Sequence, residues 1–229
     1  MKTIGLIGGM SWESTAEYYR LANELVRERL GGLHSAKALL HSVDFADIQE
    51  MQKTDRWQDA GRQLADAARS LEYSGADMVL ICTNTMHIVA EQVQDAISIP
   101  LLDIRDVTAN AVLHVNMNRV GLLATAYTME QPFYRERLAR RNIEIVIPET
   151  DDRATVNRII FDELCCGIMS DASRKATRAI IVNLAQRGCQ GIILGCTELE
   201  LLVSQDDSEV PLFASTRLHV EAAMRSALA

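Results

Sequence analysis

The chain has 229 residues, of which 48% are hydrophobic and 24% charged, and its formal net charge is -8 at pH 7. This composition is ordinary for a folded globular protein and argues against intrinsic disorder. Lys and Arg are scattered along an acidic chain, which excludes the electrostatic footprint of a nucleic-acid-binding protein. Apolar runs are too short for a membrane helix, and glycines interrupt the N-terminal one before a signal-peptide core could form. We therefore expect a cytoplasmic protein with no membrane or nucleic-acid partner.

Short apolar runs alternate with longer amphipathic runs along the chain, a pattern typical of βαβ units around a parallel sheet. The predicted strands are residues 3–7, 38–43, 78–82, 101–104, 120–124, 143–147, 191–194 and 212–214. The predicted helices are residues 14–30, 60–73, 86–96, 107–114, 129–140, 152–166, 171–186 and 216–228. Each half of the chain therefore has four predicted strands.

The chain also repeats itself. Residues 75–83 align without a gap with residues 188–196, and this alignment puts Cys196 over Thr83 rather than over Cys82. A second pair of segments, residues 4–7 and 120–123, matches at an offset of 116, which also superposes Tyr18 on Tyr134. The prolines at 100 and 211 give a third match at an offset of 111. Three matches in the same order indicate two similar halves with small loop deletions.

The predicted fold is α/β, with two similar parallel-sheet α/β domains related by a pseudo-twofold axis. We expect the first domain at residues 1–104 and the second at 105–229, with the helix at 216–228 a candidate to pack back on the first. Ligands of such sheets bind beyond the carboxyl ends of the strands. Residues 8–11, 83–85, 125–126 and 196–198 are therefore expected to meet in an active site in the cleft between the domains.

Five cysteines, an odd number without a Cys-x-x-Cys pair, are expected to be reduced. Cys196 follows a predicted strand and a glycine and precedes a helix, where backbone N–H groups can lower a thiol pKa. We therefore interpret Cys196 as a catalytic base, with buried packing as the alternative. Cys82 lies one residue earlier in its copy of the repeat, so its side chain points to the other face and is expected to pack. Cys165, Cys166 and Cys189 are also expected to pack.

The polar run from Thr83 to Thr85 stands where a strand opens into a helix, so it is either a cap or a cradle for a substrate carboxylate. His87 follows as a partner for nearby backbone or carboxylate groups. Gly8 and Gly9 lack the spacing of a dinucleotide-binding turn and are expected to let the backbone approach a small ligand. The histidines lie too far apart in sequence to suggest a metal site. We expect neither a cofactor nor a metal.

Three motifs together resemble those of the aspartate/glutamate racemases, which are cofactor-independent enzymes with two similar α/β domains. The motifs are residues 8–14 (GGMSWES), 83–87 (TNTMH) and 195–198 (GCTE), and the resemblance covers essentially the whole chain. The first motif is close to that of the enterobacterial L-aspartate/glutamate-specific racemases. The family normally has a cysteine immediately before Asn-Thr, whereas this chain has Thr83 there, as the L-specific subgroup does.

The resemblance implies an isomerase that interconverts L- and D-aspartate or glutamate. Proton removal from one face of the α-carbon and delivery to the other requires two groups, and the resemblance assigns these roles to Cys196 and Thr83. A homodimer and a small acidic amino-acid substrate are also implied, with Gln52 near the distal carboxylate. The implied substrate contacts are Met10, Gln52, Thr83, Asn84, Thr85, Thr197 and Glu198.

Two other functions stay open at the level of sequence. Relatives in the same superfamily use similar cysteines in a decarboxylase or in a cis-trans isomerase of a small dicarboxylate. A non-catalytic amino-acid-binding protein is the third alternative. Solvent deuterium entering the α-position without loss of carbon dioxide would distinguish a racemase from the other enzymes, and full turnover in Cys196→Ser or Cys196→Ala would favour the binding protein.

Overall fold

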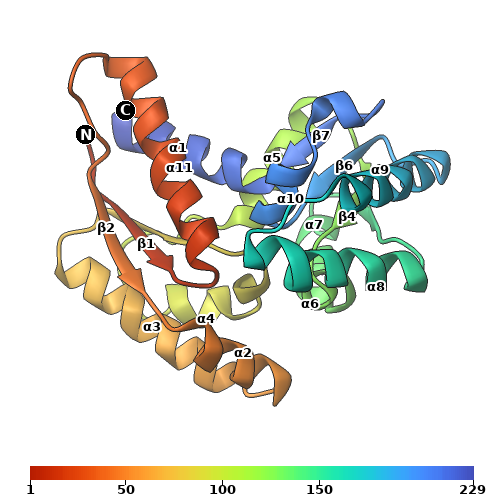
Figure 1. The fold of residues 1–229 in the computed structure, drawn as a ribbon. Coiled ribbons are helices and arrows are strands. Elements are labelled where there is room, and N and C mark those ends of the chain that lie inside the picture. The colour runs from red at the N-terminus through yellow and green to blue at the C-terminus, as the bar shows by residue number, and fades with distance from the viewer. The chain divides into compact units, whose positions relative to one another are not determined.

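The computed structural model describes residues 1–229, which form two compact units. Unit 1 contains residues 1–104 and 219–229, and unit 2 contains residues 105–218. The chain therefore passes from unit 1 to unit 2 after Ile104 and returns after Leu218. Each unit has a parallel sheet with helices packed against it (Figure 1). The predicted α/β class with two parallel-sheet domains is confirmed.

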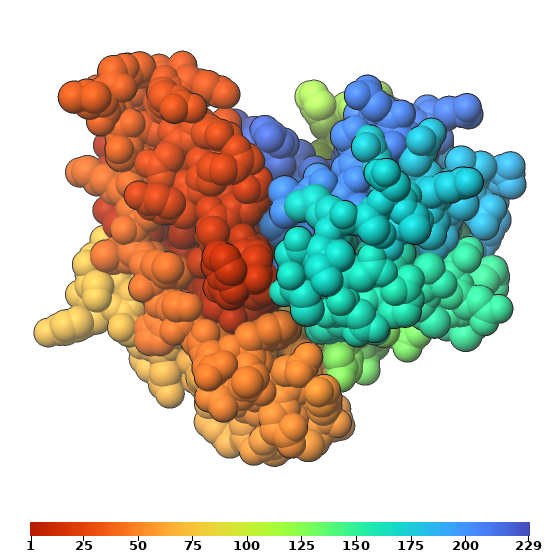
Figure 2. Space-filling view, in the orientation of Figure 1, coloured from red at the N-terminus to blue at the C-terminus, as the bar shows by residue number.

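Unit 1 has a three-stranded sheet in the order β2-β1-β3. Its strands are β1 (Ile4–Gly8), β2 (Ala38–Ser42) and β3 (Met78–Ile81). Its helices are α1 (Trp12–Leu30), α2 (Phe45–Lys53), α3 (Trp57–Tyr73), the 3-10 helix η1 (Thr85–Val89) and α4 (Ala90–Gln94), and it contains residues 219–228 of α11 (Ser215–Leu228). Figure 2 shows α2, in orange, as part of the surface of this unit.

The two faces of the first sheet are covered by different helices. Helix α3 turns Leu64, Ala68 and Leu71 toward one face, where they pack in one cluster with Ile7 and Ile81. Helices α1 and α11 cover the other face, in a second cluster that includes side chains of β1 and β3. Both faces of the sheet are thus buried at β1 and β3, which is why these two strands read as continuous apolar runs.

Unit 2 has a four-stranded sheet in the order β5-β4-β6-β7. Its strands are β4 (Arg119–Leu123), β5 (Glu144–Val146), β6 (Gly191–Leu194) and β7 (Leu212–Ala214). Helix α5 (Ile104–His114) leads into this unit, and α6 (Ala126–Glu130), α7 (Pro132–Ala139), α8 (Thr150–Arg158), α9 (Asp171–Gln186) and α10 (Thr197–Leu202) follow. Shorter turns lie at η2 (Ile159–Glu163), η3 (Leu164–Cys166) and η4 (Gln205–Asp207).

The structure corrects four predicted elements. The predicted helix 86–96 is the 3-10 helix η1 followed by the short helix α4. Residues 101–104 form no strand, because only Leu101 bridges to Val79 and helix α5 already begins at Ile104. The predicted helix 129–140 is two helices, since Pro132 begins α7 and a proline in a helix interior would cost a hydrogen bond. The predicted helix 152–166 is α-helical only to Arg158.

The strand register confirms the internal repeat. Ile4 pairs with Met78 in the first sheet, and Val120 pairs with Gly191 in the second, which reproduces the offsets of 116 and 113. The third offset recurs in hydrogen bonds. The Val79 amide donates to the Pro100 carbonyl over 2.9 Å, and the Ile192 amide donates to the Pro211 carbonyl over 2.8 Å. The strands β2-β1-β3 of the first sheet therefore repeat the arrangement of β5-β4-β6 in the second, which adds β7.

Helix length and polarity leave no segment of this structure suited to span a bilayer.

Candidate active site

Thr83 and Cys196 stand at equivalent places in the two units. Thr83 lies two residues beyond the end of β3, and Cys196 lies two residues beyond the end of β6. Each of these strands pairs in parallel with the first strand of its own sheet, β3 with β1 and β6 with β4, in equivalent register. The carboxyl ends of parallel strands are where such folds place reactive groups. Each unit thus presents one hydroxyl or thiol at its own ligand-binding edge.

In unit 1, Thr83 belongs to a segment that is held tightly on both sides. The Thr83 side chain is half-buried, and Asn84 and Thr85 after it are buried. Ser14 Oγ donates to the Cys82 carbonyl over 3.1 Å, which joins the start of α1 to the end of β3. The Nδ1 atom of His87 lies 2.8 Å from the Thr83 carbonyl oxygen. The backbone of Thr83 is therefore fixed while part of its side chain stays accessible.

Cys82 has the packing role predicted for it. Its side chain is fully buried in the cluster that includes Leu80 and Tyr18, on the face covered by α1 and α11. Burial raises the pKa of its thiol well above the ordinary value. Cys82 therefore stays a neutral thiol. The packing prediction also holds for buried Cys189, but it is wrong for Cys166, which is exposed.

Gly8, which ends β1, and Gly9 both lie where the chain of unit 1 approaches itself closely. A Cβ atom on Gly8 would lie 2.3 Å from Thr15 Cγ2, and one on Gly9 would lie 2.1 Å from the Val43 carbonyl oxygen. Gly9 also has a φ of +89° and donates its N–H to Thr15 Oγ1 over 2.9 Å. Within unit 1, close approach of the chain to itself explains both glycines, so the expected approach to a ligand is not needed to account for them.

Gln52 and Met10 bring substrate-binding candidates from two other elements of unit 1. Gln52 lies on α2, is buried, and directs its amide nitrogen at Met86 Sδ over 3.2 Å. Met10 is buried in the cluster that also contains Met86. A thioether is a weak acceptor, so the Gln52 amide holds its position with a bond that a carboxylate could readily replace.

In unit 2, Cys196 is the N-cap residue of α10 and is buried. Its thiol donates to Glu198 Oε2 over 2.9 Å. Burial first, and then the negative charge of Glu198, raise the pKa of Cys196 well above the ordinary value. A backbone hydrogen bond from Glu198 opposes this shift but is the smallest contribution. The predicted lowering of the Cys196 pKa by backbone N–H groups is therefore wrong, because burial and a carboxylate outweigh the start of a short helix.

Thr197 belongs to a brace at the carboxyl ends of β6 and β7. The hydroxyl oxygens of Thr197 and Thr216 lie 2.8 Å apart, and the Thr216 amide donates to Glu200 Oε1 over 2.7 Å. Ser215 Oγ donates to the Leu194 carbonyl over 2.7 Å. The loop that carries Cys196 and Glu198 is thus held to its neighbouring strand by side-chain hydroxyls.

The predicted site residues fall into two groups, one in each unit. Unit 1 contains Met10, Gln52, Thr83, Asn84 and Thr85, and unit 2 contains Cys196, Thr197 and Glu198. Sequence reasoning gave Glu198 a role in substrate binding only, and the structure adds its bond to the thiol. The two-residue spacing of Cys196 and Glu198 allowed this contact but did not require it. No group of three His, Cys, Asp or Glu side chains in the structure could hold a metal ion.

Comparison with known proteins gives a consistent result. A model of the Asp/Glu/hydantoin racemase family matches residues 7–223. A candidate Asp/Glu racemase from Yersinia pestis has 51% sequence identity and a TM-score of 0.94, with both chains covered completely. An aspartate racemase homologue from Pyrococcus horikoshii has 33% identity and a TM-score of 0.88, again with both chains covered completely. The broad specificity amino-acid racemase RacX of Bacillus subtilis is 24% identical over 93% of this chain and 92% of its own.

Proposed function

This chain belongs to the Asp/Glu/hydantoin racemase family, and from that premise we propose that it is a cofactor-independent racemase that interconverts L- and D-aspartate and L- and D-glutamate. In this proposal, Cys196 and Thr83 are the two proton-transfer groups. The observation that carries the assignment is their equivalence, since each stands two residues past the same strand of a repeated sheet. Racemisation requires proton transfer on both faces of one carbon, and two equivalent groups match that requirement.

The bond between Cys196 and Glu198 supports a specific first step. The thiol proton passes to Glu198 Oε2 along the existing 2.9 Å hydrogen bond, which leaves a thiolate and a neutral carboxylic acid. The thiolate then removes the α-proton of the L-enantiomer and becomes a thiol again, while the substrate becomes a carbanion. A resting thiol with a raised pKa is a strong base once its own proton has left. Glu198 therefore serves as the proton acceptor that Cys196 needs.

Thr83 completes the reaction on the other face. Its hydroxyl donates a proton to the carbanion and receives one from water in the same event, so that no free alkoxide accumulates. The hydroxide ion left from that water is neutralised by the proton that Glu198 returns to solvent before the next cycle. The D-direction runs through the same steps in reverse. Because a hydroxyl is a far weaker acid than a thiol, the two faces have unequal proton chemistry.

Buried polar side chains support the binding assignments. Asn84, Thr85 and Thr197 provide hydrogen-bonding groups beside the two reactive residues, and amide and hydroxyl donors suit a substrate carboxylate. We assign the distal carboxylate to Gln52, whose amide donor is held only by Met86. A neutral amide makes a weaker and less length-selective contact than a bidentate arginine, which accounts for acceptance of both aspartate and glutamate. Cytoplasmic location and a homodimer complete the proposal.

Incubation with L-aspartate and L-glutamate in deuterated water tests this function. The expected result is loss of the α-proton signal by nuclear magnetic resonance and formation of the deuterated D-enantiomer by chiral chromatography, with no carbon dioxide released. Release of carbon dioxide would instead indicate a decarboxylase. Binding without exchange, together with full retention of binding in Cys196→Ala, would indicate an amino-acid-binding protein.

A further inference from the structure

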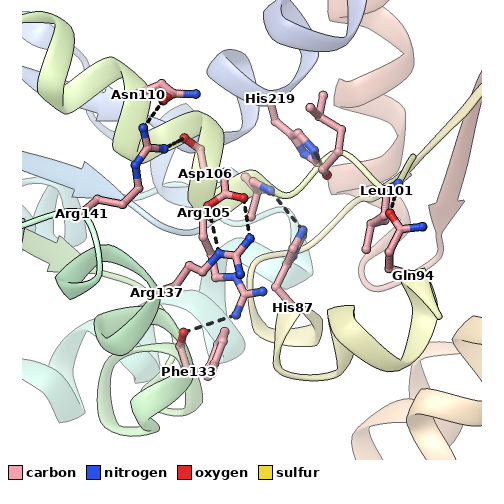
Figure 3. A network of polar contacts seen from close by, with 12 residues as sticks. His87, Gln94, Leu101, Arg105, Asp106, Asn110, Phe133, Arg137, Arg141 and His219 are labelled. Carbon is pink, nitrogen blue, oxygen red and sulfur yellow. Dashed lines mark hydrogen bonds and ion pairs between the residues drawn. The ribbon is translucent and has the colours of Figure 1, made fainter. Parts of the chain in front are cut away.

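Two buried histidines of unit 1, His87 and His219, form hydrogen bonds with backbone atoms of Thr83, Leu102 and Ile104. His87 receives a hydrogen bond from the Ile104 amide, whose nitrogen lies 3.2 Å from His87 Nε2 (Figure 3). A backbone N–H can only donate, so Nε2 is the unprotonated nitrogen of a neutral ring. The proton is therefore on Nδ1, which donates to the Thr83 carbonyl over 2.8 Å. His87 thus connects Ile104 to the backbone of Thr83.

His219 has the opposite tautomer by the same reasoning. Its Nε2 lies 2.8 Å from the Leu102 carbonyl, which can only accept, so Nε2 carries the proton. Its Nδ1 then accepts from the Tyr18 hydroxyl over 2.9 Å. The imidazole rings of His87 and His219 are 6.0 Å apart in an edge-on arrangement. The two rings hold the segment from Leu102 to Ile104 at both of its ends.

These bonds lie at the two points where the chain changes units. Ile104 is the last residue of unit 1 before the first crossing, and His219 is the first residue after the second. Both crossings are therefore fixed to unit 1 by histidine side chains, and one of those histidines also holds Thr83. A shift of the Leu102–Ile104 segment would change the donor and acceptor positions around His87.

We propose that His87 is a positioning residue for racemisation, which sets the Thr83 hydroxyl through the Nδ1–H bond to the Thr83 carbonyl, and that His219 supports it by holding the crossing segment. This inference rests on the proposed function, in which Thr83 delivers the proton on one face. A misplaced Thr83 would slow proton delivery on its own face and leave exchange at the Cys196 face largely intact. The products of the reaction report the rate of proton delivery on each face separately.

The readout is the partition of the carbanion formed from the L-enantiomer in deuterated water. The Cys196 thiol first carries the abstracted proton; once that proton has exchanged with solvent, return from the Cys196 face gives deuterated L-substrate, and delivery from the Thr83 face gives the D-enantiomer. The ratio of these two products measures the Thr83 step against the Cys196 step. A merely structural defect lowers both rates together and leaves the ratio unchanged.

Two replacements of His87 form a matched pair. In His87→Asn, the side-chain amide nitrogen can take the place of Nδ1 and keep the bond to Thr83, while the acceptor for Ile104 is lost. In His87→Gln, the amide oxygen can take the place of Nε2 and keep the Ile104 bond, while the donor to Thr83 is lost. We expect His87→Gln to raise the ratio of deuterated L-substrate to D-enantiomer by about tenfold, and His87→Asn to stay near the wild-type ratio. Equal ratios in both folded variants, with only the overall rate reduced, would overturn the proposal.

Thr83→Val and a second histidine pair keep the test decisive. If the wild-type protein neither exchanges nor racemises the substrates, the proposed function fails. If Thr83→Val raises the ratio and His87→Gln does not, this inference alone fails. Should His87→Gln not fold, as judged by circular dichroism, His219 supplies the same comparison. His219→Gln keeps a donor for Leu102 and should retain the ratio, while His219→Asn loses that donor and should raise it; no difference between them would contradict the proposal.

Discussion

The Cys196 thiol donates a hydrogen bond of 2.9 Å to the carboxylate of Glu198, two residues further along the chain. The thiol is buried, and both burial and that carboxylate raise its pKa. In the proposed mechanism, the resting site thus contains a protonated cysteine next to the carboxylate that accepts its proton. Charge develops on sulfur only when the proton moves to Glu198.

Glu198→Gln separates the two effects of this carboxylate. Removal of the negative charge should lower the pKa of Cys196, since Glu198 raises it. The same substitution removes the proton acceptor, so kcat should fall by about a hundredfold, within the range typical for loss of a general base. The pH dependence of alkylation by iodoacetamide reports the thiol pKa, and chiral chromatography reports kcat. Glu209→Gln, at an exposed site of the same unit, is the control and should change neither.

The bond from Cys196 to Glu198 marks the limit of what the sequence could predict at the site. Residues 191–194 were predicted as a strand and form β6 with the same bounds, because an apolar run between glycines leaves few alternatives. The equivalence of Thr83 and Cys196 was also predicted, and the register confirms it. The protonation state of Cys196 was not predictable, because it depends on burial and on the direction in which a flexible carboxylate side chain turns.

Helix α2 shows a second limit. It carries only a short apolar stripe, with Phe45 and Met51 partly buried and Ile48 and Gln52 buried, so the periodic signal on which helix prediction depends is brief. At residues 101–104 the opposite error occurs, because the sequence predicts a strand and none forms. Leu101, Leu102 and Ile104 are apolar and the segment follows a proline, as β7 does, but helix α5 takes over at Ile104 after a single bridge. Local pattern could not distinguish a short strand from one bridging residue.

His219 makes stability depend on pH. Burial, with a smaller contribution from nearby His87, lowers its pKa from the ordinary 6.5 to about 3. Between these values the unfolded chain binds a proton at this ring and the folded protein does not, so the free energy of unfolding falls as pH falls from 6.5 toward 3. The expected loss is on the order of 4 kcal/mol across that window. Urea denaturation at several pH values measures it. His219→Gln should show a flatter slope, and an equal slope would show that His219 is not the responsible group.

We expect Gly9 to be intolerant of a side chain, and comparison with Gly75 separates the steric clash from backbone strain. Gly9→Ala places a Cβ 2.1 Å from the Val43 carbonyl oxygen at a φ of +89°. Gly75→Ala has nearly the same backbone conformation, with a φ of +93°, but its Cβ meets nothing within 4 Å. Backbone strain alone should cost Gly75→Ala about 1 to 3 kcal/mol, and Gly9→Ala should cost clearly more. Thermal unfolding of both variants tests this. Similar losses would mean that the turn relaxes around the new methyl group.

Gln52 should control the choice between aspartate and glutamate. Gln52→Arg introduces a fixed positive fork for the distal carboxylate, and we expect it to change the aspartate-to-glutamate ratio of kcat/KM by about tenfold. Gln52→Met keeps a similar volume and removes the donor, so KM should rise for both substrates with little change in their ratio. Steady-state kinetics of the three proteins on both substrates provide the test. An unchanged ratio in Gln52→Arg would remove Gln52 from the specificity determinants.

The central claim is that the two proton-transfer groups are unequal, a thiol at Cys196 and a hydroxyl at Thr83. Because the equilibrium constant between enantiomers is one, kcat/KM must be equal in both directions, and the inequality can appear only in kcat and KM separately. The most direct measurement is kcat for L-to-D and D-to-L conversion in the wild-type protein and in Thr83→Cys. We expect kcat values that differ by about tenfold or more in the wild type and converge in Thr83→Cys. Equal values in the wild type, unchanged by Thr83→Cys, would contradict it.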